Sequence, residues 1–140
     1  MTPEISDPAV RAVFAAFPAP ARDGLLALRQ LIFEIAQDTS AAGVVKESLR
    51  WGQPAYLTPV TRTGSTLRLG VPKGAAFALF VHCQSQLIPE FAQAYPGWDR
   101  FEGRRAVLFQ DRAEIDPLRH GWLIRRALIY HVRPPLTAAD

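Results

Sequence analysis

Two short alternating segments joined by a turn constrain the fold of this chain most strongly. In Ser65–Val71 every second side chain is a large apolar one, which is typical of a strand with one face on a core. In Ala76–Cys83 both sets of alternating side chains are mainly apolar, which predicts a central strand or one whose second face lines a pocket. A Pro-Lys-Gly turn separates the segments. We therefore expect a hairpin inside an antiparallel sheet.

Helix signals lie on both sides of this hairpin. Asp7-Pro8 and Asp116-Pro117 each place an N-cap residue before a proline, which predicts that a helix begins at each proline. Residues 21–38 carry apolar side chains at helical spacing and predict the longest helix, which should cover the sheet. The remaining expected elements are strands at 44–51, 55–57 and 104–109 and a helix at 84–95.

The order of these elements predicts the fold class. It reads α-α-β-β-β-β-α-β-α, with most strands consecutive rather than alternating with helices. Such an order is typical of an α+β fold, here an antiparallel sheet of about five strands with the N- and C-terminal helices packed on one face. We expect residues 1–140 to form one domain, because 49% of the side chains are hydrophobic and no linker interrupts them.

Composition sets outer limits on the function. No apolar run reaches the length that spans a bilayer, so no membrane partner is expected. The N-terminus lacks the pattern of a signal peptide, and the single Cys83 cannot form an intramolecular disulfide. A cytoplasmic location is the expectation. The formal net charge is +3, and the positive charge is not concentrated in one half of the chain.

The stretch KESLRWGQPAY, residues 46–56, holds the first candidate site. On an extended backbone Glu47 shares a face with Trp51, so its carboxylate needs a partner, for which Arg68 on a neighbouring strand is a candidate. Aromatic walls with a few polar groups would form a ligand pocket. The predicted ligand-binding residues are Glu47, Trp51, Tyr56, Arg68 and His82, with Phe80 as a further wall. The alternative is that Glu47 forms a structural ion pair and that the aromatic residues, Trp51 included, fill the core.

No metal or catalytic motif emerges from the other reactive residues. His82 and Cys83 are adjacent and should point to opposite faces of a strand, so they cannot form one site, and Cys83 is expected to be an inert buried thiol. His120 and His131 lie too far apart on one helix for a zinc motif. No catalytic signature is present, so we assign no catalytic residue, metal or cofactor, and whether the chain is an enzyme is left open.

Arginines on the last helix are the remaining candidates. Arg119, Arg126 and Arg133 are spaced by seven residues and should form a solvent-facing line. The helix should end before Pro134-Pro135. A nucleic-acid partner is not expected, because neither interleaved exposed aromatic residues nor a known motif accompanies these arginines.

The stretch Glu47–Tyr56 resembles the Glu-x-x-x-Trp-Gly-x-Pro-x-Tyr/Phe signature of the YdhG-like bacterial domains of unknown function. The resemblance covers about residues 20–132. It implies a small domain with an antiparallel sheet packed by helices, in which Gly52 and Pro54 form a structural bend. One member of that family is described as a frataxin-like iron chaperone, a role that implies exposed carboxylates. The chain departs from that pattern in being basic overall.

Three hypotheses about function follow. The leading one is a non-catalytic binding domain that holds a small ligand or a protein segment at the Trp-Gly-x-Pro face. The alternative is a frataxin-like intracellular iron chaperone, which the family resemblance implies. The second alternative is a structural or oligomerisation module, such as a homodimer whose interface covers Trp51.

Overall fold

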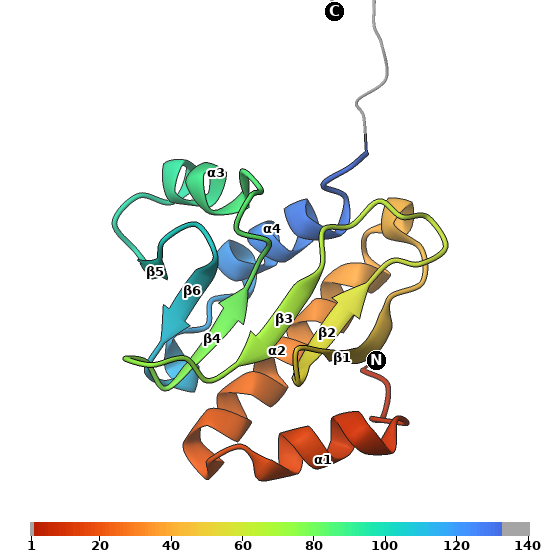
Figure 1. Cartoon of the computed structure of the whole chain (residues 1–140). Helices are drawn as coiled ribbons and strands as arrows, with labels where there is room; N and C mark the ends of the chain where they lie inside the picture. The colour runs from red at the N-terminus through yellow and green to blue at the C-terminus, as the bar shows by residue number, and fades with distance from the viewer. Residues whose placement is uncertain (1, 133–140) are drawn as a thin grey trace, which may run out of the picture.

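The computed structural model describes residues 2–132 and has the α+β architecture that the sequence predicts (Figure 1). Its helices are α1 Pro8–Ala16, α2 Ala19–Gln37, α3 Leu87–Ala94 and α4 Pro117–Leu128, with short 3-10 turns η1 Ser40–Ala42 and η2 Arg112–Glu114. Its strands are β1 Lys46–Arg50, β2 Gln53–Leu57, β3 Leu67–Gly70, β4 Phe77–Phe80, β5 Arg100–Glu102 and β6 Ala106–Phe109.

The strands form one antiparallel sheet in the order β1-β2-β3-β4-β6-β5. It has six strands rather than about five, because β5 forms an additional edge strand beside β6. β5 spans only three residues, which is too short for alternation to be recognised in the sequence. The expected hairpin is confirmed as β3–β4.

The Asp-Pro pairs begin helices as predicted. The side chain of Asp7 accepts a hydrogen bond from the backbone N–H of Ala9, and that of Asp116 accepts one from Leu118. In both helices the proline occupies the first turn, where its missing N–H is not needed. α4 ends at Leu128, whereas Arg133 and the expected stop at Pro134-Pro135 lie outside the described residues.

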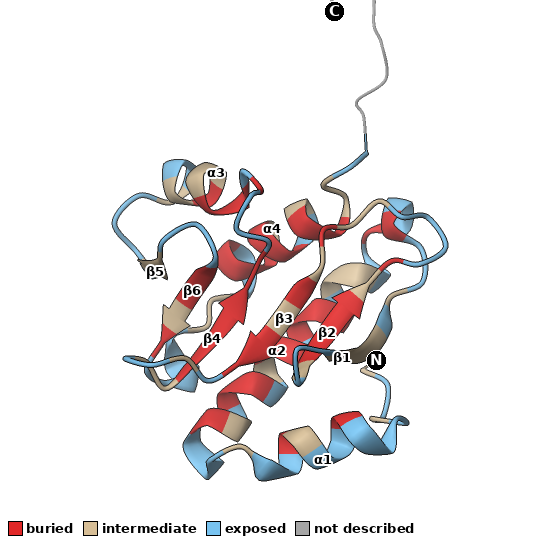
Figure 2. Cartoon of the chain, in the orientation of Figure 1, coloured by how far each residue is buried: buried red, intermediate tan, exposed pale blue. Residues whose placement is uncertain are grey.

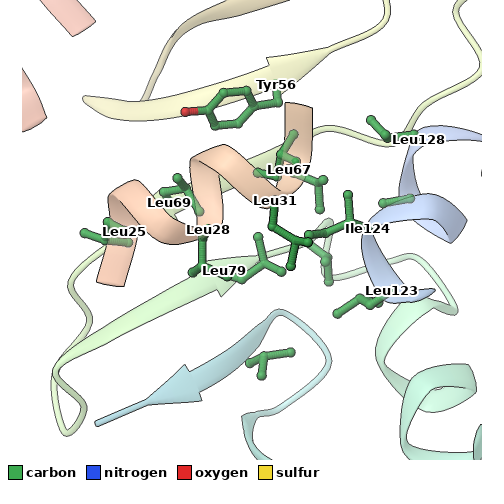
Figure 3. Close-up of a cluster of buried hydrophobic side chains, with 14 of the residues drawn as sticks. Leu25, Leu28, Leu31, Tyr56, Leu67, Leu69, Leu79, Leu123, Ile124 and Leu128 are labelled. Atoms are coloured by element: carbon green, nitrogen blue, oxygen red, sulfur yellow. The ribbon is translucent and has the colours of Figure 1, made fainter. Parts of the chain in front are cut away.

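The main core lies between the sheet and α2 with α4. Leucine and isoleucine side chains from these helices point toward the inward side chains of β2, β3 and β4 (Figure 3). Close packing is possible because Gly24 of α2 lies directly against the ring of Phe77 on β4. A Cβ at Gly24 would be only 2.2 Å from Cζ of that ring. The expectation that residues 21–38 cover the sheet is therefore confirmed.

Within residues 2–132 no helix covers the opposite face of the sheet, which we call the open face (Figures 1 and 2). The strand register places a second, smaller apolar cluster on it, made of Ala78, Phe80, Ala106 and Leu108. Within residues 2–132 no helical side chain packs against this cluster. The sheet is thus closed on one side only.

In the described part of the chain, no helix has the length and apolar character needed to cross a membrane.

Candidate functional site

The carboxylate of Glu47 lies on the helix-covered face of the sheet and forms a buried ion pair with Arg29 of α2. Arg29 donates from Nε to Oε2 of Glu47 at 2.6 Å and from Nη2 to Oε1 at 3.0 Å. The hydroxyl of Tyr56 donates to the same Oε2 at 2.7 Å. The Arg29 guanidinium also lies 5.0 Å from the centre of the Phe33 ring. Glu47 therefore has a complete set of partners inside the protein.

Burial and the neighbouring carboxylate keep the hydroxyl of Tyr56 protonated. Burial raises the pKa of Tyr56 well above its ordinary value, and the negative charge and hydrogen bond of Glu47 raise it further. Tyr56 thus stays a hydroxyl and remains a donor to the carboxylate. Of the two interpretations of Glu47, the structural ion pair is what the structure contains, but its partner is Arg29 rather than Arg68.

Trp51 lies in the two-residue turn of the β1–β2 hairpin, where Arg50 pairs with Gln53. The φ angles of Trp51 and Gly52 are 56° and 74°, and type I′ hairpin turns require positive φ at both central residues. The side chain of Trp51 is 88% exposed. The expectation that Trp51 fills the core is wrong, because a turn residue leaves the alternation of the strand that precedes it.

The two predicted bend residues behave differently. Gly52 takes the left-handed conformation that glycine permits, as expected. Pro54 is part of β2 and pairs with Leu49, so it does not break the strand. The pairing of β2 with β3 involves Ala55 and Tyr56, beyond Pro54, so the missing N–H of the proline interrupts no contact there.

Arg68 lies on the open face, opposite to Glu47 and Tyr56. Its Nη1 donates to Oε1 of Gln53 at 2.6 Å, and its guanidinium lies 5.4 Å from the centre of the Phe80 ring. Partial burial lowers the pKa of Arg68 from its ordinary value, and the positive charge of Arg105 lowers it further. Any anion bound near Arg68 would relieve this repulsion.

Other basic side chains share the open face with Arg68. The register places Lys46, Arg50 and Arg100 on the same side of the sheet. Within residues 2–132, none of these three forms an ion pair with a carboxylate. Among the strand residues of the described chain, Glu102 is the acidic one on this face, and Arg105 pairs with it at 3.2 Å. The open face therefore has an excess of positive charge.

His82 and Cys83 lie beyond the end of β4, and both are exposed. The prediction of a buried Cys83 is wrong, because the strand ends at Phe80 and its alternation does not continue to residue 83. Nδ1 of His82 accepts a hydrogen bond from the backbone N–H of Gln84 at 3.1 Å. His82 lines a cleft of about 360 Å³ that also contains His131.

The five predicted site residues therefore do not surround one pocket. Glu47 and Tyr56 are joined on the helix-covered face, Arg68 lies on the open face, and His82 and Trp51 lie beyond strand ends. The sheet itself separates the first pair from Arg68.

A second buried polar cluster connects α4 with the start of β5, and the sequence did not reveal it. Asp99 accepts a hydrogen bond from Nε of Arg119 at 2.8 Å, and its other oxygen lies 2.8 Å from Nε2 of His120. Nδ1 of His120 accepts from the backbone N–H of Asp116, so the imidazole proton is on Nε2 and is donated to Asp99. Both ring nitrogens are therefore occupied, which leaves neither free for acid–base chemistry.

Arg119 was expected in a solvent-facing line, and that expectation is wrong. Its side chain is buried, and its Nη1 also donates to Asp116 at 3.0 Å. The spacing of His120, Leu123, Ile124 and Ala127 is helical, and all four are buried. A histidine on such an apolar stripe could have indicated a buried polar partner.

A cleft of about 410 Å³ borders this cluster. Its wall includes Trp98, which is 69% exposed and has the Arg119 guanidinium 5.0 Å from its ring centre. Leu108 and Arg100 also line it, and both belong to the open face. The open face thus continues into this cleft at the β5 side of the sheet.

Burial by itself would raise the pKa of Asp99. Hydrogen bonds from His120 and Arg119, together with the positive charge of Arg119, more than offset that effect and hold the pKa below its ordinary value. The carboxylate is therefore ionised at neutral pH and orders the side chains behind the cleft.

Within residues 2–132, no group of three or more His, Cys, Asp and Glu side chains is arranged to hold a metal ion. Comparison with known proteins gives no match, since no family model, curated protein or solved structure is significantly similar to the chain. The resemblance of Glu47–Tyr56 to the YdhG-like signature stays a prediction.

Proposed function

We propose that this chain is a non-catalytic binding protein whose open face holds an acidic segment of a partner protein. The observation that carries the proposal is the position of Trp51, an exposed tryptophan at the tip of a hairpin beside the basic face. The occupant belongs to the class that the leading hypothesis from the sequence named, a protein segment at the Trp-Gly-x-Pro stretch.

Folding alone does not favour tryptophan at this place. Type I′ turns prefer Asn-Gly, because bulky residues adopt positive φ at a conformational cost. Trp51 has a φ of 56° and is 88% exposed, so little core packing offsets that cost. Strain at an exposed aromatic residue is typical of a functional position, and tryptophan is enriched among residues that dominate protein interfaces.

The charge of the open face supports an acidic partner. Lys46, Arg50 and Arg100 lack carboxylate partners within residues 2–132, and the arginine at position 68 is close to that at position 105. Arginine binds carboxylates through paired N–H donors, and complementary charge accelerates association. These side chains extend from β1 to β5, which favours an extended occupant over a small molecule.

The same charge disfavours the iron alternative at this surface, because basic side chains repel a metal cation. A homodimer through Trp51 requires no acidic partner and would reveal itself as a change of oligomeric state in the Trp51→Asn variant. The two hypotheses therefore differ from the proposal in measurable ways.

Isothermal titration of the full chain with a synthetic peptide of about ten Glu and Asp residues tests the proposal. We expect binding that weakens with salt, and at least about ten-fold weaker binding by Trp51→Asn and Arg68→Ala. Arg126→Ala is the matched control, because Arg126 lies on α4 and pairs with Glu90. The control should bind like the unmodified chain.

Two outcomes would contradict the proposal. One is an affinity that neither open-face variant changes. The other is tight binding of a twelve-nucleotide oligothymidine, dependent on Trp51 and Arg68, without binding of the acidic peptide. The second outcome would mark the face as a nucleic-acid site, which combines basic and aromatic side chains in a similar way.

A further inference from the structure

The cleft beside Trp98 lies at the opposite end of the open face from Trp51. One residue of each strand forms a row across the sheet between them, in the order Arg50, Gln53, Gly70, Ala78, Leu108 and Arg100. The row begins next to Trp51, and its last two members line the cleft. An exposed tryptophan therefore flanks each end of the row.

The middle of the row has short side chains. Gly70 has no side chain, and a Cβ there would lie 2.4 Å from Nε2 of Gln53, so the Gln53 amide covers the glycine. Ala78 is the next member and pairs with Gly70. Adjacent strands lie about 4.8 Å apart, so a row across six strands is about 24 Å long. An extended segment covers this length with about seven residues.

The cleft differs in charge from the rest of the open face. Asp99, Glu114 and Asp116 line it together with two arginines. Arg119 forms ion pairs with both Asp99 and Asp116, and Arg100 has no carboxylate partner within residues 2–132, so the three carboxylates exceed the two arginines by one negative charge. The carboxylate of Glu114 is exposed, and the side chain of Asp116 keeps 44% of its surface accessible although it pairs with Arg119.

The remaining wall suits the stem of a long side chain. Leu108 and Ala113 provide apolar surface, and Trp98 keeps most of its ring accessible although Arg119 lies over it. A lysine or arginine side chain combines an apolar stem with a cation, and cations bind both carboxylates and indole rings. The single excess negative charge of the cleft favours such a cation over an acidic side chain.

We infer that the cleft is the specificity pocket of the open face and takes a lysine or arginine side chain at one end of the acidic run of the bound segment. This inference rests on the proposed function. It adds a length to the partner: carboxylates lie over β1 to β4, and one basic residue lies at the β5 end, about seven residues from the residue beside Trp51.

Two synthetic peptides test the pocket on the full chain. Both have eight glutamates, and they end in lysine or in glutamine. The lysine peptide should bind about ten-fold more tightly, because it adds an ion pair and a cation–π contact. Glu114→Gln should reduce this preference to about two- or three-fold and leave the affinity for the glutamine peptide unchanged.

The matched control is Asp38→Asn, which removes an exposed carboxylate at the end of α2, outside the cleft. It should keep the ten-fold preference. Glu114 is exposed, and its Oε1 accepts from the backbone N–H of Gln110, which a glutamine side chain can still do. The variant should therefore fold.

The outcomes separate the two proposals. Equal affinities for both peptides, still dependent on Trp51 and Arg68, would overturn the pocket and leave the proposed function intact. Peptides that bind without dependence on Trp51 or Arg68, or that do not bind, would overturn both. A lysine preference that Glu114→Gln does not change would also overturn the pocket.

Discussion

At the level of single residues, the stretch Glu47–Tyr56 serves two opposite purposes. Glu47 and Tyr56 tie the hairpin to Arg29 of α2 inside the protein. Trp51, between them in sequence, is almost completely exposed. The dense chemistry of this stretch is therefore divided between the core side and the solvent, which is why the predicted single pocket does not form.

Glu47→Gln should lower the free energy of unfolding by about 3 kcal/mol, because it leaves the buried Arg29 guanidinium without its counter-charge. Urea denaturation at neutral pH measures this loss. Glu102→Gln is the control, since its pair with Arg105 is solvent-exposed and should contribute less than about 1 kcal/mol. Equal small effects would contradict the buried ion pair.

Trp51→Asn should leave the free energy of unfolding unchanged or raise it by up to about 1 kcal/mol, because asparagine tolerates positive φ better than tryptophan. The same urea experiment checks this prediction. A loss of more than about 1 kcal/mol would mean that Trp51 packs within the protein and would remove the main support for its role in binding.

The lowered pKa of Asp99 predicts how the free energy of unfolding changes at low pH. The pKa of an aspartate in an unfolded chain is about 3.9, and the pKa of Asp99 in the native protein is lower. Ionised Asp99 therefore stabilises the fold at pH values above about 3.9. This contribution is lost as the pH falls through the native pKa. The stability difference between the unmodified chain and Asp99→Asn should therefore shrink below about pH 4. Denaturation curves from pH 6 to pH 2.5 measure it, and a constant difference over this range would contradict the assignment.

The sequence predicted that Glu47 needs a partner, but it placed that partner on the wrong element. Leu67 and Leu69 point to the core, so Arg68 between them points to the open face. Glu47 shares the core side with Leu49, and its cationic partner comes from the helix that covers this side. The alternation of side chains along β3 therefore excludes Arg68 as the partner of Glu47. That Arg29 is the partner depends on how α2 crosses the sheet.

At the level of secondary structure, elements with strong local signals were predictable. The Asp-Pro pairs fixed the starts of α1 and α4, and alternation fixed β3 and β4. The three-residue β5 carries no such signal, since its pairing with β6 creates it. The cleft beside Trp98 depends on this edge strand, so the sequence pattern does not predict the cleft.

The contact between α2 and β4 should be sensitive to one methyl group. Gly24→Ala places a Cβ against the Phe77 ring and should destabilise the fold by about 1–3 kcal/mol, despite the higher helix propensity of alanine. Phe77→Leu makes room for that methyl group. The double variant should therefore be more stable than the sum of the two single effects predicts. Strict additivity would show that Gly24 does not pack on Phe77.

At the level of the whole molecule, the fold divides the basic residues into exposed ones on the open face and buried ones in ion pairs. Composition cannot distinguish these two groups. The net charge of +3 is modest and evenly divided along the sequence. Strand pairing nevertheless gathers basic residues of β1, β3 and β5 on the open face, whereas Arg29 and Arg119 are buried in ion pairs. The predicted solvent-facing line of arginines is wrong for Arg119, because the burial of Arg119 depends on its ion pair with Asp99, twenty residues earlier in the chain.

If the open face binds an acidic segment, a bound peptide should lie along it. Titration of the nitrogen-15-labelled chain with the lysine-ending glutamate peptide, followed by amide chemical shifts, measures that location. We expect shifts at Arg50–Gln53, along β3 and β4, and at Trp98–Arg100, with α1 and α2 unchanged. Shifts confined to the helices, or no shifts at saturating peptide, would contradict binding at the open face.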